Sequence, residues 1–308
     1  MAAFFFALLR RLLRSIFLLF CVLTAVFALL RAVPGGPFDG ERELTPEAAA
    51  ALRAHYGTDE SLLRSYFRYV SRTVRGDLGP SFCQLGWSVG ELLADKVRVS
   101  FELGAYAFLL ALLLGIPWGC QAARYPEKFF SRSAMAVATV LICIPSFALG
   151  PILDHIFALR LHWFRVMGWC GWRCKVLPSV TLGIIQAAFL ARLTRRSLAG
   201  EFARPYVRTA RAKGLSESAV FWKHILRNGI GPTIAYLGPT CAALLSGTFA
   251  VESIFHIPGL GRLFIESIGN RDYGLVTGIV LLYALLIIVC NFFADVLLAA
   301  IGPRGGSG

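Results

Sequence analysis

The chain has 308 residues, of which 56% belong to the hydrophobic set and only 16% are charged. Soluble domains carry about a quarter charged residues, so this composition and the mean hydropathy of +0.64 exclude an ordinary soluble protein. The net charge of +13 does not indicate nucleic-acid binding, because Lys and Arg gather beside apolar runs, where lipid phosphates favour them. The composition predicts an all-α polytopic membrane protein.

Six segments are long and apolar enough to cross a bilayer, which takes about 20 predominantly apolar helical residues. The first begins with basic residues, as a signal peptide does. Its apolar run is long, however, and no small-x-small cleavage site follows, so we interpret it as a retained span. The fourth is the weakest, because it is short and contains Ser179, Thr181 and Gln186. The six segments are 15–33, 103–123, 134–158, 176–193, 229–255 and 275–301.

The charge of the short loops predicts the orientation. With the N-terminus inside, the inner flanks hold 16 Lys and Arg residues and the short outer loops hold 6, as expected when positive charge stays in the cytoplasm. Six spans then place both termini on the cytoplasmic side. The predicted parts are the N-terminal segment with the first span (1–34), an external loop (35–101), a five-helix core (102–302) and a cytoplasmic tail (303–308).

The long external loop is predicted to be helical. In "LTPEAAAALRAHYG", Thr45 is a helix cap, Pro46 takes the first helical position and Gly57 lies beyond the end. A second helix follows in "TDESLLRSYFRYVSRTVRGDLG" and is expected to stop at Gly76. These helices either cover the bundle or contact a substrate directly.

Two cysteines share a short polar connection between the third and fourth spans. Cys170 and Cys174 could form a disulfide if this connection faces an oxidising compartment, and otherwise remain thiols. His162 lies upstream, but four well-spaced zinc ligands are not present. The cysteines inside the apolar runs are expected to be small buried side chains.

Familiar catalytic motifs are absent from the sequence. It contains no G-x-x-x-x-G-K-[ST] phosphate loop, no H-E-x-x-H zinc motif and no G-x-S-x-G nucleophile turn. The few ionisable residues within spans are functional candidates, because burying their charge is costly. Asp154, His155 and Asp295 lie near span ends and could reach interfacial water.

Glu252 is the strongest of these candidates. It lies in "GTFAVESIFHIPGLGR", where an apolar helix leads into a turn rich in glycine and proline. Broken helices of this kind line cavities in transporters more often than they face lipid. We therefore assign Glu252, Pro258, Gly259 and Gly261 to the translocation path or its gate. The different-class alternative is an intramembrane enzyme that uses Glu252, Asp154 or His155.

The loop over 199–228 is basic, long and predicted to be cytoplasmic. A short helix is expected over 206–213, ended by Gly214 in the left-handed conformation. Ser216 then caps a second helix, with Glu217 favourably placed in its first turn. The resulting projection either lies on the membrane as a basic anchor or inserts into a groove on a soluble partner.

The residues of this loop resemble a known family. "YVRTARAKGLSE" is similar to the coupling loop, or EAA loop, of ABC-importer permeases of the oligopeptide/dipeptide/nickel group. "RRLLRSIFLLF", "GDLGPSF" and "VESIFHIPGLGRLFIES" resemble other segments of that group, so the likeness covers nearly the whole chain. The long external loop resembles the first, or B-type, permease subunit.

The resemblance implies a transport subunit of the bacterial inner membrane without enzymatic activity or a cofactor of its own. ATP and Mg would bind to two cytoplasmic ATPase subunits, and a second permease and an extracytoplasmic substrate-binding protein would complete the importer. The coupling residues implied are Tyr206, Ala210, Lys213, Gly214 and Leu215. The implied cargo is an oligopeptide or dipeptide, with nickel or another small solute as the same-family alternative.

The sequence departs from the family in three places. The acidic position of the general loop pattern is lost at Arg208-Thr209-Ala210, and Gly302 stands where the family often has an acidic residue. The segment "GWCGWRCKVLP" is unusually rich in cysteine and tryptophan, which leaves the cargo less defined than the fold. A self-contained channel is a third hypothesis, and it predicts flux without nucleotide.

Overall fold

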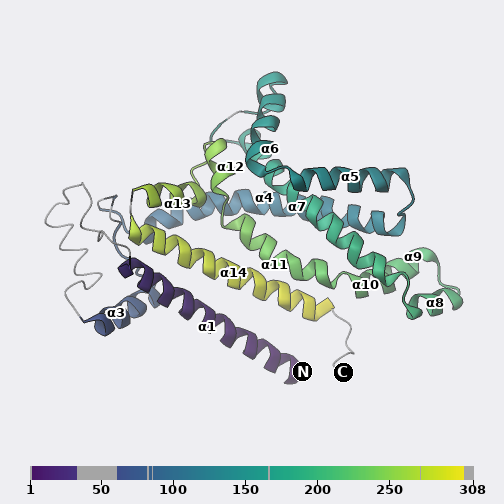
Figure 1. Cartoon of the computed structure of the whole chain (residues 1–308), viewed down its shortest axis with the longest axis horizontal. Coiled ribbons are helices and arrows are strands. Elements are labelled where there is room, and N and C mark those ends of the chain that lie inside the picture. The colour runs from purple at the N-terminus through teal and green to yellow at the C-terminus, as the bar shows by residue number, and fades with distance from the viewer. Residues whose placement is uncertain are drawn as a thin grey trace. The chain divides into compact units, whose positions relative to one another are not determined.

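A computed structural model describes residues 2–32, 61–81, 83–84, 86–165, 167–270 and 272–301 (Figure 1). Within these ranges the secondary structure is helical, apart from an isolated bridge between Pro80 and Ser88. The described residues form two compact units. One takes residues from Met1–Ser100 and Pro258–Ile288, and the other from Phe101–Ile257 and Val289–Gly308.

In the first unit, helix α1 (Ala2–Ala32) packs against α3 (Leu62–Val74) through aromatic side chains. The ring centroids of Phe27 and Tyr66 are 5.3 Å apart, and the hydroxyls of Tyr66 and Thr24 are 2.7 Å apart. Gly76, at φ 82°, follows the end of α3. This confirms the second of the two helices predicted for this loop, whereas the first, over 45–57, falls outside the described residues, and the external position of the loop stays a prediction.

The first unit also contains the start of α4 (Val89–Arg124), α13 (Leu260–Gly269) and the first part of α14 (Tyr273–Ile301). Asp272, between α13 and α14, joins the start of α14 to the segment that precedes α4. It accepts hydrogen bonds from the backbone N–H of Leu275, at 3.0 Å, and from the hydroxyl of Ser81. The apolar core here comprises Val89, Leu92, Leu93, Leu260, Leu263, Leu275 and Ile279.

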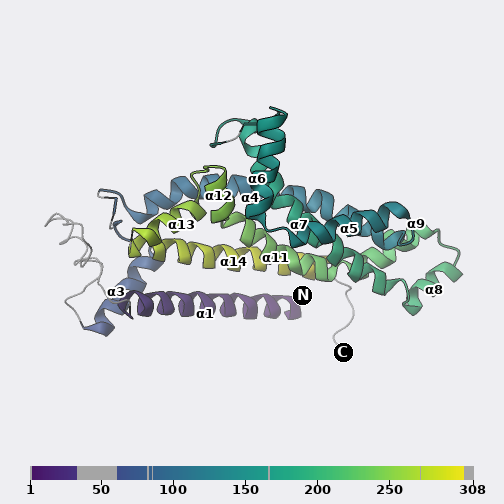
Figure 2. The same cartoon turned by 45° about the horizontal axis from the view of Figure 1, so that its top comes forward.

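The second unit is arranged around α7 (Trp172–Glu201), which packs against α5 (Phe129–Cys143) and α11 (Gly231–Leu245). Helix α5 runs beside α7, and the loop after α7 projects beyond its C-terminal end (Figures 1 and 2). The remaining elements of the unit are the rest of α4, α6 (Ser146–Leu153), the π-helical η1 (Asp154–Arg160), α12 (Phe249–Ile254) and the end of α14.

Glycines allow α4 and α7 to approach closely at two levels. A side chain added at Gly183 would place its first carbon 2.7 Å from the carbonyl oxygen of Ala107. The same addition at Gly119 would lie 2.6 Å from the carbonyl oxygen of Ala191. Small residues at such contacts let helix backbones meet within a membrane, where packing replaces the hydrophobic effect as the main stabilising interaction.

The all-α polytopic class is confirmed, and the number of six spans stays a prediction. In the described part, four helices are long and apolar enough to cross a membrane, and α1 contains a shorter apolar stretch, Leu13–Leu29. The predicted third span is not one straight helix, because α5 and the helix of α6 and η1 meet at 108°. The break falls at Ile144, whose ψ of 119° is extended, as expected for a residue before proline.

Candidate functional site: the loop after α7

The first half of the loop is helix α8 (Pro205–Ala212). Pro205 is at its first position, where the fixed φ of proline suits a helix and its missing N–H is not needed. Val207 and Ala210, three residues apart and hence on one face, are buried. Helix α8 matches the predicted helix over 206–213 within one residue at each end.

Gly214 turns the chain after α8. Its φ is 76°, in the left-handed region, and its N–H donates to the carbonyl oxygen of Arg211 at 2.9 Å. A side chain at Gly214 would meet nothing within 4 Å. The requirement for glycine therefore comes from the backbone conformation and not from crowding. The left-handed corner was predicted and is confirmed.

The second half begins at Ser216, whose hydroxyl oxygen accepts a hydrogen bond from the N–H of Ala219 at 3.3 Å, as predicted for a cap. Short α9 (Glu217–Ala219), the π-helical η2 (Val220–Ile225) and α10 (Leu226–Gly229) follow. The widened turn of η2 was not predicted. The apolar side chains in this stretch suit either helix type, so the sequence carries no signal for it.

The loop packs against the rest of the second unit through a hydrophobic cluster, which we call the loop seat. Its buried members come from α4, α7, α8 and η2. A displacement of α8 must therefore move these side chains, and with them the ends of α4 and α7. The members of the loop seat are Cys120, Ala123, Leu198, Val207, Ala210, Val220, Phe221 and Ile225.

An ion pair spans the corner. Arg211 Nε donates to Glu217 Oε1 at 2.7 Å, and Arg211 Nη2 donates to Glu217 Oε2 at 3.1 Å. These bonds lower the pKa of the Glu217 carboxyl and raise that of the Arg211 guanidinium. This pair was not predicted from the sequence, although opposite charges on both sides of a turning glycine could have indicated it.

Tyr206 is held on the side of α8 that faces the unit. Its hydroxyl donates to Glu201 Oε2 at 2.6 Å, and its ring packs against the loop seat. Burial, together with the bond to Glu201, raises the pKa of the Tyr206 hydroxyl.

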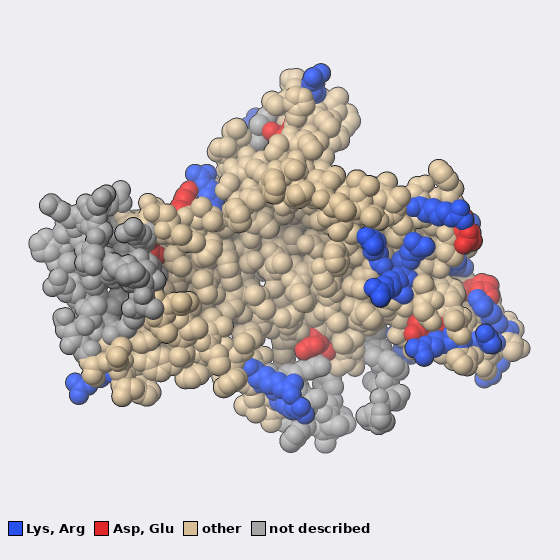
Figure 3. Space-filling view, viewed as in Figure 1, with Lys and Arg blue, Asp and Glu red and all other residues tan. Residues whose placement is uncertain are grey.

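The five predicted coupling residues therefore fall into two groups. Tyr206 and Ala210 contact the unit, and Ala210 is only 5% exposed. Lys213, Gly214 and Leu215 are exposed at the corner. Figure 3 shows Lys and Arg side chains gathered over this end of the unit. Beside the corner, Arg124, Arg211, Glu217 and other residues line a hollow of about 440 Å³.

The predicted gating residues lie around the break after α12. Glu252 is fully buried, and its backbone carbonyl oxygen accepts a hydrogen bond from the N–H of Ile257 at 2.8 Å. Pro258 and Gly259 form the turn before α13, and Gly261 is buried in the first turn of that helix. The broken helix is confirmed, while the part that these residues play in gating stays a prediction.

The connection before α7 is closed by a Cys170–Cys174 disulfide, one of the two alternatives left open by the sequence. Lys175 pairs with Glu102 of α4, and its ammonium lies 4.9 Å from the ring centroid of Trp169. Tyr106 donates to Glu102 Oε1 at 3.0 Å. In the part of the chain that the structure describes, no group of three His, Cys, Asp or Glu side chains could hold a metal ion.

Comparison with known proteins identifies the family to which the sequence is similar. Residues 115–305 match the family described as binding-protein-dependent transport system inner membrane component. The oligopeptide transport system permease protein OppB of Escherichia coli (strain K12) is 39% identical over 298 residues, which cover 96% of this chain and 97% of that protein. The dipeptide transport system permease protein DppB of Bacillus subtilis (strain 168) is 37% identical over 283 residues, covering 92% of each.

A solved structure supports the same fold. A chain of the MetNI methionine ABC transporter in an inward-facing conformation superposes with a TM-score of 0.57 at 19% sequence identity, covering 69% of this chain and 97% of that one. The family match covers more than half of the chain, and the relatives align with nearly its full length. The chain therefore belongs to the family of binding-protein-dependent transport system inner membrane components.

Proposed function

We propose that this chain is the first permease subunit of an ABC importer for oligopeptides or dipeptides, and that the corner at Gly214 couples it to a separate ATPase. The near-full-length relatives named for oligopeptide and dipeptide transport support the cargo class. Both termini and the loop after α7 lie in the cytoplasm. A second permease, two ATPase subunits that bind ATP and Mg, and an extracytoplasmic binding protein complete the importer.

The observation that carries the coupling role is the construction of the loop. The corner presents Lys213, Gly214 and Leu215 to solvent, while α8 behind it is fixed to α4 and α7 through the loop seat. An ATPase groove that grips the corner can therefore pull on the ends of two long helices. Moving these helices against the partner permease gives alternating access at the other face.

The charge of the corner contributes less than its shape. Lys213 is exposed, and an exposed ion pair with an acidic groove rim stabilises a contact by only ~0–1 kcal/mol. The turn itself matters more, because a residue with a Cβ in the left-handed region costs roughly 1–2 kcal/mol. The rigidity of the turn is therefore the property to test.

The test is Gly214→Val in the complete importer reconstituted in liposomes. Valine should destabilise the left-handed turn by about 1–2 kcal/mol. The fraction of importers with the correct turn, and with it transport and substrate-stimulated ATP hydrolysis, should then fall by about five- to thirtyfold. Gly200→Val is the matched control, because Gly200 lies in α7 with nothing within 4 Å of an added side chain and without a positive φ. Subunit assembly is measured in both variants by size-exclusion chromatography.

Normal transport by Gly214→Val would contradict the coupling role. Gly214→Asn provides a graded check, since asparagine enters the left-handed region more readily than valine and should restore part of the transport. Uptake of peptides is compared with uptake of nickel in the same liposomes. Nickel uptake without peptide uptake would replace the proposed cargo and leave the coupling result unaffected.

The proposed orientation has a separate test. Leu62→Cys in α3 and Leu215→Cys at the corner both replace exposed side chains. In intact cells, a membrane-impermeant maleimide should label the position in α3 and should reach the corner only after permeabilisation. In everted vesicles, a crosslinker on Leu215→Cys should capture the ATPase. Labelling of the corner from outside would overturn the orientation.

A further inference from the structure

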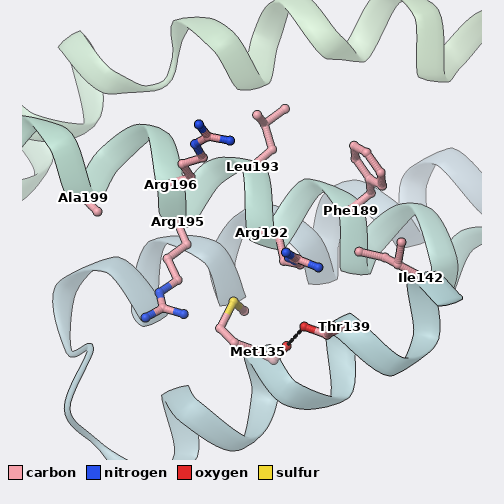
Figure 4. A pocket seen from close by; sticks show the side chains of 9 residues that line it. All are labelled: Met135, Thr139, Ile142, Phe189, Arg192, Leu193, Arg195, Arg196 and Ala199. Carbon is pink, nitrogen blue, oxygen red and sulfur yellow. Dashed lines mark hydrogen bonds between the residues drawn. The ribbon is translucent and has the colours of Figure 1, made fainter.

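A groove between α5 and α7, within the second unit, has a volume of about 540 Å³ (Figure 4). This is within the range of roughly 300–1,000 Å³ found for small-molecule sites. The groove is distinct from the corner at Gly214, and the proposed transport mechanism does not use it. Its lining residues are Met135, Thr139, Ile142, Phe189, Arg192, Leu193, Arg195, Arg196 and Ala199.

The groove carries concentrated positive charge without compensation. Three arginines line it, Arg192, Arg195 and Arg196, and no Asp or Glu does. None of the three forms an ion pair with another residue in the described part of the chain. Like charges this close repel one another, so an anion that bridges them would be stabilised.

The groove is also divided along its length. In Figure 4, Arg192 and Arg195 extend from α7 toward Met135 and Thr139 of α5, while Phe189 and Ile142 lie together at the other end. One end therefore offers guanidinium groups, and the other offers an aromatic and an aliphatic side chain. A small inorganic anion would use only the first end. A molecule with an anionic head and an apolar tail would use both.

We propose that this groove binds an anionic phospholipid, with its phosphate between Arg192 and Arg195 and an acyl chain against Phe189 and Ile142. Guanidinium groups bind phosphate oxygens through paired, charge-assisted hydrogen bonds. Basic pockets between membrane helices on the cytoplasmic side are suited to such head groups. The cytoplasmic placement of this end of α7 rests on the proposed orientation.

The bound head group lies next to the coupling loop. Arg195 and Ala199 line both this groove and the hollow that contains Arg211 and Glu217. The lipid thus contacts the end of α7 at the point from which the loop leaves it. Binding itself is the property to measure, because it does not require the importer to be active.

The test is retention of lipid by the complete importer, purified in detergent and examined by native mass spectrometry. The probes are phosphatidylglycerol, phosphatidylcholine and inorganic phosphate, added separately. The wild type should retain phosphatidylglycerol over phosphatidylcholine, and Arg192→Gln with Arg195→Gln should lower this retention by about five- to tenfold per arginine. Arg208→Gln removes an exposed arginine of α8 outside the groove and should leave retention unchanged.

Two further variants guard against misfolding and test both ends. Arg192→Lys with Arg195→Lys keeps the charge but loses the paired geometry, so it should retain an intermediate amount of lipid. Phe189→Ser should weaken lipid retention without changing any charge. Equal retention by all variants would overturn the proposal. Complete displacement of phosphatidylglycerol by inorganic phosphate would also overturn it, because the acyl chain would then contribute nothing. So would a purified complex in which the second permease covers the groove.

Discussion

The two ends of α7 treat their charges in opposite ways. At the N-terminal end Lys175 pairs with Glu102, and its ammonium also lies over the ring of Trp169. Toward the C-terminal end Arg192 and Arg195 have no ion-pair partner among the described residues. The charges of the N-terminal end are therefore paired within the chain. In the proposals above, the C-terminal end is completed by other molecules, the lipid and the ATPase.

Packing does not account for this difference. Both halves of α7 approach α4 closely, at Gly183 in the N-terminal half and at Gly119 of α4 against the C-terminal half. The contrast between the ends lies in their polar groups. Mutations in the packing common to both halves should therefore affect the whole helix pair, whereas removal of single polar groups should affect the two ends differently.

The largest effect is expected from filling the helix contact. Gly119→Val or Gly183→Val brings a side chain within 2.7 Å of a carbonyl oxygen, so the helices must separate, with a loss of stability of about 3 kcal/mol. Gly200→Val, in open space on α7, is the control. The stability of the three variants is compared by thermal unfolding of the purified importer in detergent. Similar midpoints for Gly119→Val and Gly200→Val would show that this contact does not stabilise the fold.

The next effect concerns the ion pair between Lys175 and Glu102. Lys175→Ala leaves the partly buried carboxylate of Glu102 without its cation, and we expect a loss of about 1–2 kcal/mol. Arg192→Ala, toward the C-terminal end of α7, removes a side chain without such a partner among the described residues and should change stability by less than about 0.5 kcal/mol. Equal losses in thermal unfolding for the two variants would remove the contrast between the ends.

A smaller effect is expected at the corner. Arg211 and Glu217 are both exposed, so a double-mutant cycle with alanine should give a coupling energy of about 0.5 kcal/mol in thermal unfolding. The pair should weaken further at high salt, because exposed charges are screened. A coupling energy of several kcal/mol would mean that the pair is buried in the assembled importer.

The smallest effect is a pH dependence of the same pair. Arg211 lowers the pKa of Glu217 below its usual value of 4.5, so the folded corner favours the ionised carboxylate. The resulting stabilisation is present above pH 4.5 and is lost as the pH falls through the lowered value. The protection factors of the amides around Gly214, which correct for the slower intrinsic exchange at low pH, should therefore fall in acid in the wild type and not in Glu217→Gln. The same acid response in both would exclude this carboxylate as the cause.

Much of the loop after α7 could be predicted because its signals are local. Pro205, Gly214 and Ser216 each act on their own backbone, and the structure has the helix start, the left-handed turn and the cap where these residues stand. The third predicted span was harder to predict. The segment over 134–158 is apolar enough to cross a membrane, but the helix bends at Pro145, and a hydropathy count does not detect a bend.

Long-range pairings could not be read from the sequence. Lys175 and Glu102 are 73 residues apart, and nothing local to either position identifies the other. The same holds for the groove, since Met135 and Thr139 of α5 acquire a basic neighbourhood only when α7 lies beside them. Arg192, Arg195 and Arg196 were counted in the sequence as evidence of orientation, and their gathering on one groove became visible only in three dimensions.

The membrane class, the family and the local shape of the loop after α7 could be predicted from the sequence, because long apolar runs, basic flanks and residues with special backbone preferences act over a few positions each. How α4 and α7 meet, and which charges are paired within the described part of the chain, depends on the tertiary structure. Those outcomes depend on which distant side chains are brought within a few ångströms of one another when the helices pack.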